Sequence, residues 1–310
     1  DEIDERNNQI VTLRASKDPA QRATVKGLRV VGPATIHRIH ATLRKALNDA
    51  VRKKRYIESN PALFVELPSA KPPKARVWTD ERVARWKETG ERPSPVMVWT
   101  PDQTGQFLDH VEAVDDRLYA LYHLVALRGL RRGEACGQHW DDLDLDALTL
   151  SVRWQIVQHG WATAMDTPKT DGSDATIALD TNTGTVLRAH RTRQRRERLA
   201  ADATWTHTGL TFTTATGAAL HPADVTDHFH RLAAEAGLPP IRLHDLRHGA
   251  ATLALAAGAD MKTVQALMRH SSYNLTANLY AHVLPDLARQ AAEATAAIIP
   301  RRRRPNTDAA

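Results

Sequence analysis

The chain contains a single cysteine, Cys136, among its 310 residues. One thiol cannot form a disulfide within the chain, and it cannot supply the several thiolates of a cysteine-based zinc site. Long apolar runs are also missing, since none approaches the roughly 18 residues that a membrane-spanning helix requires. The first ten residues, DEIDERNNQI, are mostly charged or polar and do not resemble a secretory signal peptide. We therefore expect a soluble protein of the cytoplasm.

Other signals are absent too. The first residue is not Met, which leads us to expect that the chain begins inside a longer protein. No internal repeat is visible, and no acidic cluster has the spacing of a Mg²⁺ site. What is present is a hydrophobic fraction of 42%, enough for ordinary cores, and a net charge of +6 in which Arg is far commoner than Lys. A basic balance of this kind suits a polyanionic partner such as nucleic acid.

A long helix is predicted after Gly32-Pro33, because proline is favoured just inside a helix start. Its apolar residues recur at intervals of three and four residues and therefore form one stripe along the helix: Ile36, Ile39, Leu43, Leu47 and Val51. Its other faces are rich in cations, and we mark these as candidate DNA-binding residues: Arg38, Arg44, Lys45, Arg52, Lys53, Lys54 and Arg55. From the pattern alone this helix is either a solvated amphipathic helix or one that lies against phosphates.

Composition divides the chain. Residues 68–78 combine prolines and cations with little apolar content, which is typical of a linker, and a second turn-rich stretch runs from Glu91 to Pro101. A length of 310 residues also favours two domains. We therefore expect four parts: a helical N-terminal domain over 1–68, a linker over 69–98, a larger domain over 99–298 and a basic tail over 299–310.

The larger domain is predicted to be mainly α with a small three-stranded antiparallel sheet. Alternating apolar residues predict strands over 148–156, 161–165 and 175–179, separated by turns at His159-Gly160 and Asp171-Gly172. Helical periodicity, with Pro at starts and Gly at ends, predicts the helices. These are one that opens at Pro101-Asp102 and others over 117–128, 183–200, 222–236, 243–257, 260–269 and 276–298.

Five short polar motifs stand out in this domain, and each has an ordinary explanation on its own. An Arg-Arg pair beside Gly is usually a surface turn, a hairpin Lys is usually solvated, and a His or Tyr on a helix is usually packing or a cap. The motifs in chain order are Gly-Leu-Arg-Arg-Gly-Glu at 129–134, Thr-Pro-Lys-Thr at 167–170, His-Asp-Leu-Arg-His at 244–248, Arg-His-Ser-Ser at 269–272 and Leu-Tyr-Ala-His-Val at 279–283.

In this order, the motifs resemble the catalytic constellation of the tyrosine recombinases, in particular the site-specific integrases of phages and other mobile elements. The resemblance covers about 100–298, and 34–68 resembles the end of that family's helical core-binding domain, which would be incomplete at its N-terminus. It implies a two-domain DNA clamp whose larger part is the catalytic domain. It also implies these roles: Tyr280 as nucleophile, Arg131 and Arg247 as a phosphate clamp, His244 as proton acceptor, His270 as a further donor to the phosphate, Lys169 as general acid and Glu134 as a supporting residue.

Three residues depart from the family pattern. Arg128 stands where a Thr is common, and Tyr273 adds a second tyrosine near the nucleophile segment. Arg269 replaces the small residue, usually Gly, that precedes the second histidine, and we expect it to crowd the backbone near the phosphate. We assign the nucleophile to Tyr280 because the family's Ala-His-Val follows it.

The implied activity is DNA strand exchange through a 3′-phosphotyrosine, without cofactor, metal or ATP. Its partners would be double-stranded attachment sites, three further copies of the chain in a tetramer, and accessory DNA-bending proteins, at the nucleoid. The apolar stripe of Leu284, Leu287, Ala291 and Ile298 would pack in cis or dock on another protomer. Three alternatives remain: a type IB topoisomerase-like enzyme, a non-catalytic sequence-specific DNA-binding protein of the same fold, and, more remotely, a His-dependent metal hydrolase.

Overall fold

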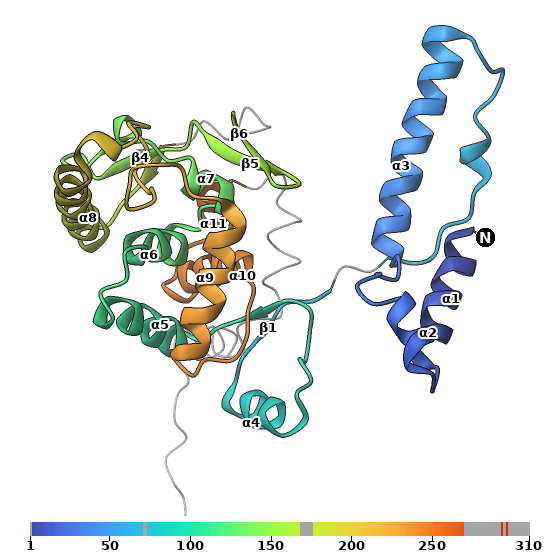
Figure 1. Ribbon diagram of the computed structural model, residues 1–310, viewed down its shortest axis with the longest axis horizontal. Coiled ribbons are helices and arrows are strands. Elements are labelled where there is room, and N and C mark those ends of the chain that lie inside the picture. Colours follow the sequence, from blue (N-terminus) through green and yellow to red (C-terminus); the bar gives the residue numbers. More distant parts are fainter. Residues whose placement is uncertain (1, 71–72, 168–175, 270–292, 294–295, 297–310) are drawn as a thin grey trace, which may run out of the picture. The chain divides into compact units, whose positions relative to one another are not determined.

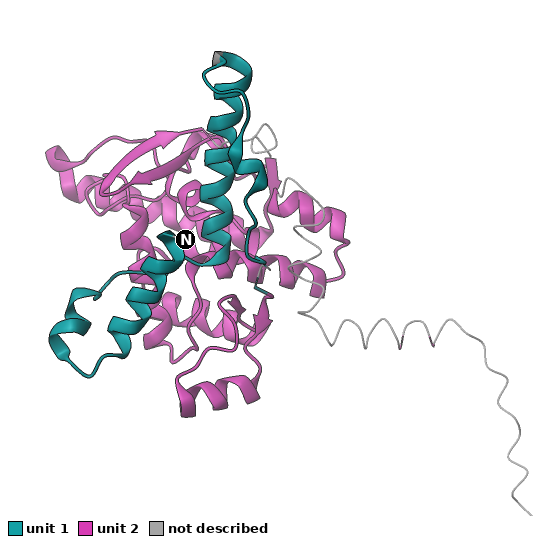
Figure 2. Cartoon of the chain, turned by 90° about the vertical axis from the view of Figure 1, so that its right-hand side faces the viewer, with its two compact units in different colours: residues 1–73 teal, residues 74–310 magenta. Residues whose placement is uncertain are grey.

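The computed structural model describes residues 2–70, 73–167, 176–269, 293 and 296. The chain forms two compact units, residues 1–73 and 74–310, which Figure 2 shows in different colours. The boundary lies inside the segment 69–98 that the sequence assigns to a linker. Residues 74–98 are packed into the second unit, where they form β1 (Arg76–Val77), α4 (Asp80–Thr89) and β2 (Met97–Val98). Trp78 and Val98 are fully buried, so this part of the predicted linker is structured.

The first unit consists of α1 (Glu2–Ala15), α2 (Pro19–Thr24) and α3 (Pro33–Asp49), with a π-helical turn over Ala50–Lys54 (Figure 1). Proline at its first turn starts α3, as predicted. Asn60 fastens the following segment to α3, because its side-chain amide donates to Arg44 O at 3.0 Å and to Asn48 Oδ1 at 2.8 Å. The apolar stripe of α3 is not a core stripe, since Ile39 and Leu43 are 48% and 50% exposed.

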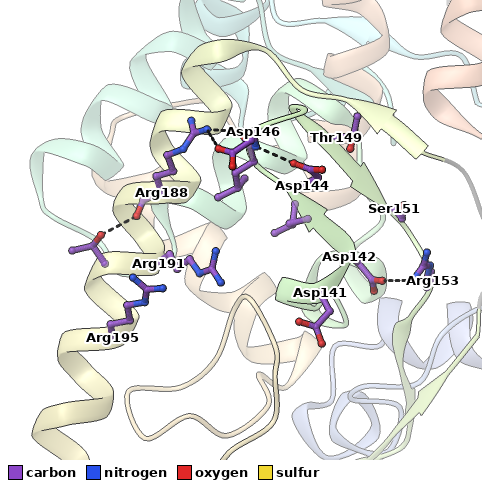
Figure 3. Close-up of a pocket in the computed structure, with 13 residues that line it drawn as sticks. Asp141, Asp142, Asp144, Asp146, Thr149, Ser151, Arg153, Arg188, Arg191 and Arg195 are labelled. Carbon is purple, nitrogen blue, oxygen red and sulfur yellow. Dashed lines mark hydrogen bonds and ion pairs between the residues drawn. The ribbon is translucent and has the colours of Figure 1, made fainter.

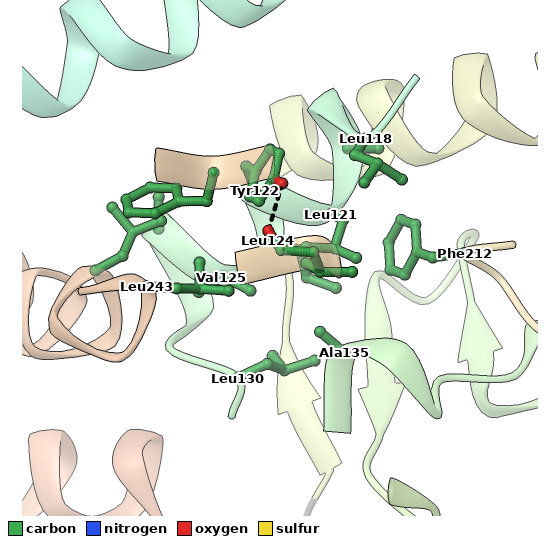
Figure 4. Close-up of a cluster of buried hydrophobic side chains, with 14 of the residues drawn as sticks. Leu118, Leu121, Tyr122, Leu124, Val125, Leu130, Ala135, Phe212 and Leu243 are labelled. Carbon is green, nitrogen blue, oxygen red and sulfur yellow. Dashed lines mark hydrogen bonds between the residues drawn. The ribbon is translucent and has the colours of Figure 1, made fainter. Parts of the chain in front are cut away.

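The second unit is built around α6 (Tyr119–Arg128), which is buried over most of its length. Around this helix lie α5, α7, α9, α10 and part of the sheet, and Figure 4 shows Leu121, Tyr122, Leu124 and Val125 packed among them. Tyr122 directs its hydroxyl to Val225 O at 2.9 Å. The helices predicted for this unit are confirmed as α5 (Pro101–Ala113), α6, α8 (Thr181–Ala201), α9 (Pro222–Glu235), α10 (Leu243–Ala256) and α11 (Met261–Met268). The helix predicted over 276–298 falls almost wholly outside the described residues.

The three-stranded antiparallel sheet is present, but its strands differ from those predicted. The sheet has the order β3-β4-β7, from β3 (Leu143–Asp144), β4 (Thr149–Ser151) and β7 (Thr176–Ala178). The predicted strand over 148–156 is wrong as one strand, because it is divided between β4 and β5 (Gln155–His159). β5 instead pairs with β6 (Ala162–Asp166) in a separate hairpin. Apolar residues alternate in the sequence through the break, so the sequence pattern does not reveal that the pairing partner changes, although Trp154 is 39% exposed.

The described part of the chain contains no helix long and apolar enough to cross a membrane.

Candidate active site

The first arginine motif joins α6 to α7 (Arg132–Cys136), and its glycines allow the close approach of three segments. Gly129 ends α6 in the left-handed region, at φ +64°, where a Cβ atom would lie 2.3 Å from Met268 Cε. At Gly133 a Cβ atom would lie 2.7 Å from Ile156 O in β5. Leu130 between them is buried in the core. The turn therefore places Arg131 at the start of α7, next to the end of α11.

Arg131 is held by Glu134, whose side chain is 1% exposed. The Glu134 carboxylate accepts from the Arg131 backbone N–H at 2.8 Å and from Arg131 Nη1 at 2.6 Å. Arg131 Nη2 also donates to Arg269 O at 3.3 Å. The Arg131 side chain keeps 39% of its surface exposed, so the guanidinium is fixed on one side and accessible on the other.

The second arginine motif forms the first turns of α10, which packs against α6. Arg247 is 1% exposed, and its guanidinium donates to two main-chain carbonyls, Gly129 O and Met268 O. These acceptors lie at the ends of α6 and α11. Arg247 thus connects two segments by hydrogen bonds. One is the turn that contains Arg131, and the other is the end of α11, just before position 270.

His244 lies one turn before Arg247 on the same helix. Protein atoms around the ring, and the positive charge of Arg247, lower the pKa of its imidazole below the ordinary 6.5. Its ring packs edge-on against His248, with centroids 4.9 Å apart. Burial, followed by the neighbouring His244, lowers the pKa of His248 to about 4. His244 is therefore neutral at pH 7, so one of its ring nitrogens is able to accept a proton.

Arg269 is the residue whose role the sequence does not reveal. It ends α11 in the left-handed region, with φ 47° and ψ 46°. We expected it to crowd the backbone near the phosphate. In the structure its side chain is 1% exposed and its guanidinium donates to Glu134. The sequence signal was present, as an arginine where the family usually has glycine, but it did not identify the partner.

Three of the predicted catalytic residues lie outside the described residues: Lys169, His270 and Tyr280. The described ones, Arg131, His244 and Arg247, come together with Glu134 where α7, α10 and α11 meet. The candidate DNA-binding residues all belong to the first unit. Arg38, Arg44 and Lys45 are exposed on α3, and Arg52, Lys53 and Arg55 are exposed in the turn that follows. Lys54 lies in the same turn.

A separate cleft of about 590 Å³ lies between α8 and the β3–β4 hairpin. Figure 3 shows its arginines facing its aspartates: Arg188 lies 3.1 Å from Asp146 and Arg153 lies 3.1 Å from Asp142. Acidic and basic groups thus largely neutralise each other there. Among the described residues, no group of His, Cys, Asp and Glu side chains is arranged to hold a metal ion.

Comparison with known proteins shows the family to which the chain belongs. The model of the phage integrase family matches residues 98–286, more than half of the chain, so the chain belongs to that family. A tyrosine recombinase XerC-like protein of Caldanaerobacter subterraneus is 33% identical over 189 residues, which are 57% of this chain and 48% of that protein. The ICEBs1 integrase of Bacillus subtilis is 25% identical over 197 residues, 63% of this chain and 53% of that protein. The chain thus spans about half the length of these relatives.

Solved structures show the same fold. The Tn1549 transposon integrase in complex with transposon right end DNA is similar, with a TM-score of 0.62 and 23% identity, over 89% of this chain and 83% of that chain. The XerA recombinase is similar, with a TM-score of 0.52 and 18% identity, over 97% of this chain and 92% of that chain. The mainly helical fold with a small antiparallel sheet is therefore that of this family.

Proposed function

We propose that this protein is a tyrosine-type site-specific DNA recombinase, an integrase that cuts and rejoins DNA strands through a 3′-phosphotyrosine intermediate. One observation carries the proposal. Two guanidiniums, Arg131 and Arg247, and a neutral imidazole, His244, are brought together from motifs more than 100 residues apart. Backbone carbonyls and a buried carboxylate hold the two guanidiniums in place.

Each of these groups has a task in phosphodiester transesterification. Negative charge builds on the nonbridging oxygens in the transition state, and two guanidiniums stabilise it with forked hydrogen bonds at any working pH. Removing one such preorganised donor typically costs about 2.7–4 kcal/mol. His244 accepts the phenol proton, since a phenol with an ordinary pKa near 10 is a poor nucleophile at neutral pH. With the clamp supplying the positive charge, the reaction requires no metal ion.

The remaining roles fall to residues that the family motifs assign. Tyr280 attacks the phosphorus and forms the phosphotyrosine, His270 donates to a phosphate oxygen, and Lys169 gives a proton to the departing 5′ oxygen. One phosphodiester replaces another of similar energy, so a second 5′ hydroxyl reverses the step without ATP. Glu134 supports the clamp by holding Arg131.

The first unit contributes DNA binding, because its exposed cations on α3 and the following turn suit a phosphate backbone. DNA is also bound in several of the similar solved structures, among them the Tn1549 integrase with transposon right end DNA and with circular intermediate DNA. We propose that four protomers act on two attachment sites, with accessory DNA-bending proteins, at the nucleoid of the host cell.

A covalent-trapping assay tests the proposal. The protein is mixed in EDTA with nicked duplexes taken from DNA that flanks its gene, and the products are run on a denaturing gel. We expect a protein–DNA adduct that Tyr280→Phe abolishes and that the matched control Tyr273→Phe retains. If the wild-type protein binds a site tightly and forms no adduct, the non-catalytic DNA-binding protein replaces this proposal. Relaxation of supercoiled DNA without a defined site would instead indicate the topoisomerase-like enzyme.

A further inference from the structure

Arg269 occupies a position that is costly for it. Its backbone is left-handed, a conformation that glycine adopts freely and that is strained for a residue with a Cβ atom. Its guanidinium is also buried, which is unfavourable for a charge unless the charge is paired. Two costs at one residue indicate that the side chain has a specific partner.

That partner is Glu134, which lies between two arginines. One carboxylate oxygen accepts from Arg131 Nη1, and the other accepts from the Arg131 backbone N–H and from Arg269. The connection is closed by Arg131 Nη2, which donates to the carbonyl of Arg269 itself at 3.3 Å. Arg269 therefore contacts the clamp twice, through its side chain on Glu134 and through its backbone on Arg131.

From this closed arrangement we infer that Arg269 is a positioning residue, which acts through Glu134 to hold the Arg131 guanidinium in the orientation that a scissile phosphate requires. The inference rests on the proposed recombinase function. In this chain Glu134 thus binds a second arginine besides Arg131, at a position where the family's usual glycine would offer no side chain.

The electrostatics of Glu134 agree with this arrangement. Burial alone would raise the pKa of its carboxyl group, but Arg269 and Arg131 more than offset burial and hold the pKa below its ordinary value. The carboxylate thus stays ionised, and both of its oxygens remain available as acceptors. Without Arg269, the Glu134 oxygen that it contacts keeps only the Arg131 backbone N–H as a donor, so the carboxylate and the Arg131 guanidinium bonded to it are held less firmly.

The variant to make first is Arg269→Gly, because glycine removes the side chain and also relieves the left-handed strain, so the protein should still fold. Arg269→Lys keeps the charge but removes the guanidinium Nη2 that donates to Glu134. Arg117→Ala is the matched control. It removes a different arginine–carboxylate pair, the partly buried one with Glu197, from a part of the second unit that does not contact Arg131.

Two measurements on the full chain decide the inference. The first is the rate of adduct formation on a saturating nicked attachment-site duplex, together with the Kd for that DNA. For Arg269→Gly we expect a rate about 10–100-fold lower at an unchanged Kd, the signature of an interaction that matters in the transition state. Arg269→Lys should be intermediate, and Arg117→Ala should keep the wild-type rate. In a Glu134→Ala background, Arg269→Gly should change the rate by less than about threefold, because the two residues act as one unit.

The second measurement needs neither DNA nor catalysis. NMR of the Arg131 guanidinium, assigned with Arg131→Lys, should show restricted rotation in the wild-type protein and fast rotation in Arg269→Gly. The same restricted rotation in both proteins would overturn the inference, as would an unchanged rate or equal losses in the two backgrounds. Absence of any wild-type adduct would count against the recombinase function alone, since the NMR comparison still tests Arg269.

Discussion

The guanidinium of Arg247 donates a hydrogen bond to the carbonyl oxygen of Gly129, which lies 118 residues earlier in the chain. The same guanidinium donates to Met268 O, so one buried side chain joins the ends of α6 and α11 to α10. The carbonyl of Gly129 belongs to the turn that presents Arg131. The two arginines of the proposed clamp are therefore parts of one hydrogen-bonded structure rather than independent contacts.

Replacement of Arg247 by Lys should lower both activity and stability. A lysine ammonium has no planar fork and cannot reproduce the directions of both carbonyl bonds. We expect adduct formation to slow by about 10²–10³-fold, the usual effect of losing one preorganised donor. The rate comes from the trapping assay, and thermal unfolding gives the change in stability. Retention of the wild-type rate would remove Arg247 from the clamp.

Gly129→Ala should destabilise the second unit by two separate effects. A residue with a Cβ atom at this left-handed position costs about 1–2 kcal/mol. The added atom would also lie 2.3 Å from Met268 Cε, so the buried Met268 side chain must move. Overpacking of a tight site typically costs about 1–3 kcal/mol more. Denaturant unfolding measures the sum.

Gly90→Ala is the control for that substitution. Gly90 ends α4 with φ +72°, and nothing lies within 4 Å of a Cβ atom built on it. This variant should therefore show only the conformational cost. Equal losses of stability in the two variants would mean that the approach of Met268 to Gly129 contributes nothing.

His248 should make the protein less stable in acid. The folded state lowers the pKa of its buried imidazole from 6.5 to about 4, so between these pH values the unfolded chain binds the proton and the folded chain does not. The free energy of unfolding is therefore unaffected above about pH 6.5 and falls as the pH drops towards 4. A shift of this size corresponds to about 3 kcal/mol in total, at 1.36 kcal/mol per pH unit.

The measurement is denaturant unfolding of the wild-type protein and His248→Gln at a series of pH values from about 7.5 to 4. In the variant, the free energy of unfolding should fall much less steeply as the pH drops from about 6.5 to 4. His159→Gln, an exposed substitution on β5, controls for replacing a histidine and should keep the wild-type slope. Parallel curves for the wild-type protein and His248→Gln would contradict the prediction.

The basic face of the first unit should appear in the salt dependence of DNA binding. Each phosphate that the protein no longer neutralises reduces the slope of log K against log salt by about 0.9. We expect the triple variant Arg38→Ala/Arg44→Ala/Arg52→Ala to lower the slope by up to about 2.7, if each residue meets a phosphate. Binding titrations on an attachment-site duplex between low and physiological salt measure the slope.

A second triple variant separates local contacts from net charge. Arg195→Ala/Arg196→Ala/Arg198→Ala removes the same charge from exposed positions on α8, in the other unit. Its slope should stay near the wild-type value. Equal reductions in the two triple variants would show that net charge, and not the first unit, governs binding.

The sequence predicted α5, α6 and α8 to α11 of the second unit, because their signals are local. Pro101 and Pro222 stand at helix starts and Gly129 at a helix end, and between such residues the apolar spacing specifies the buried face. The strands were harder to predict. Residues 148–156 alternate as one strand would, yet β4 pairs with β3 and β7 whereas β5 pairs with β6. Alternation reports which face a side chain takes and carries no information about the neighbouring strand.

By itself, the sequence determined the chemistry available to this protein: the residue types, their chain order and the family motifs that contain Arg131, His244 and Arg247. Only the tertiary structure decided how these groups are held. The bond from Arg247 to Gly129 and the pairing of Arg269 with Glu134 each join residues more than 100 positions apart. Such contacts depend on how α6, α10 and α11 pack, and packing is a property of the whole core that no local pattern of residues records.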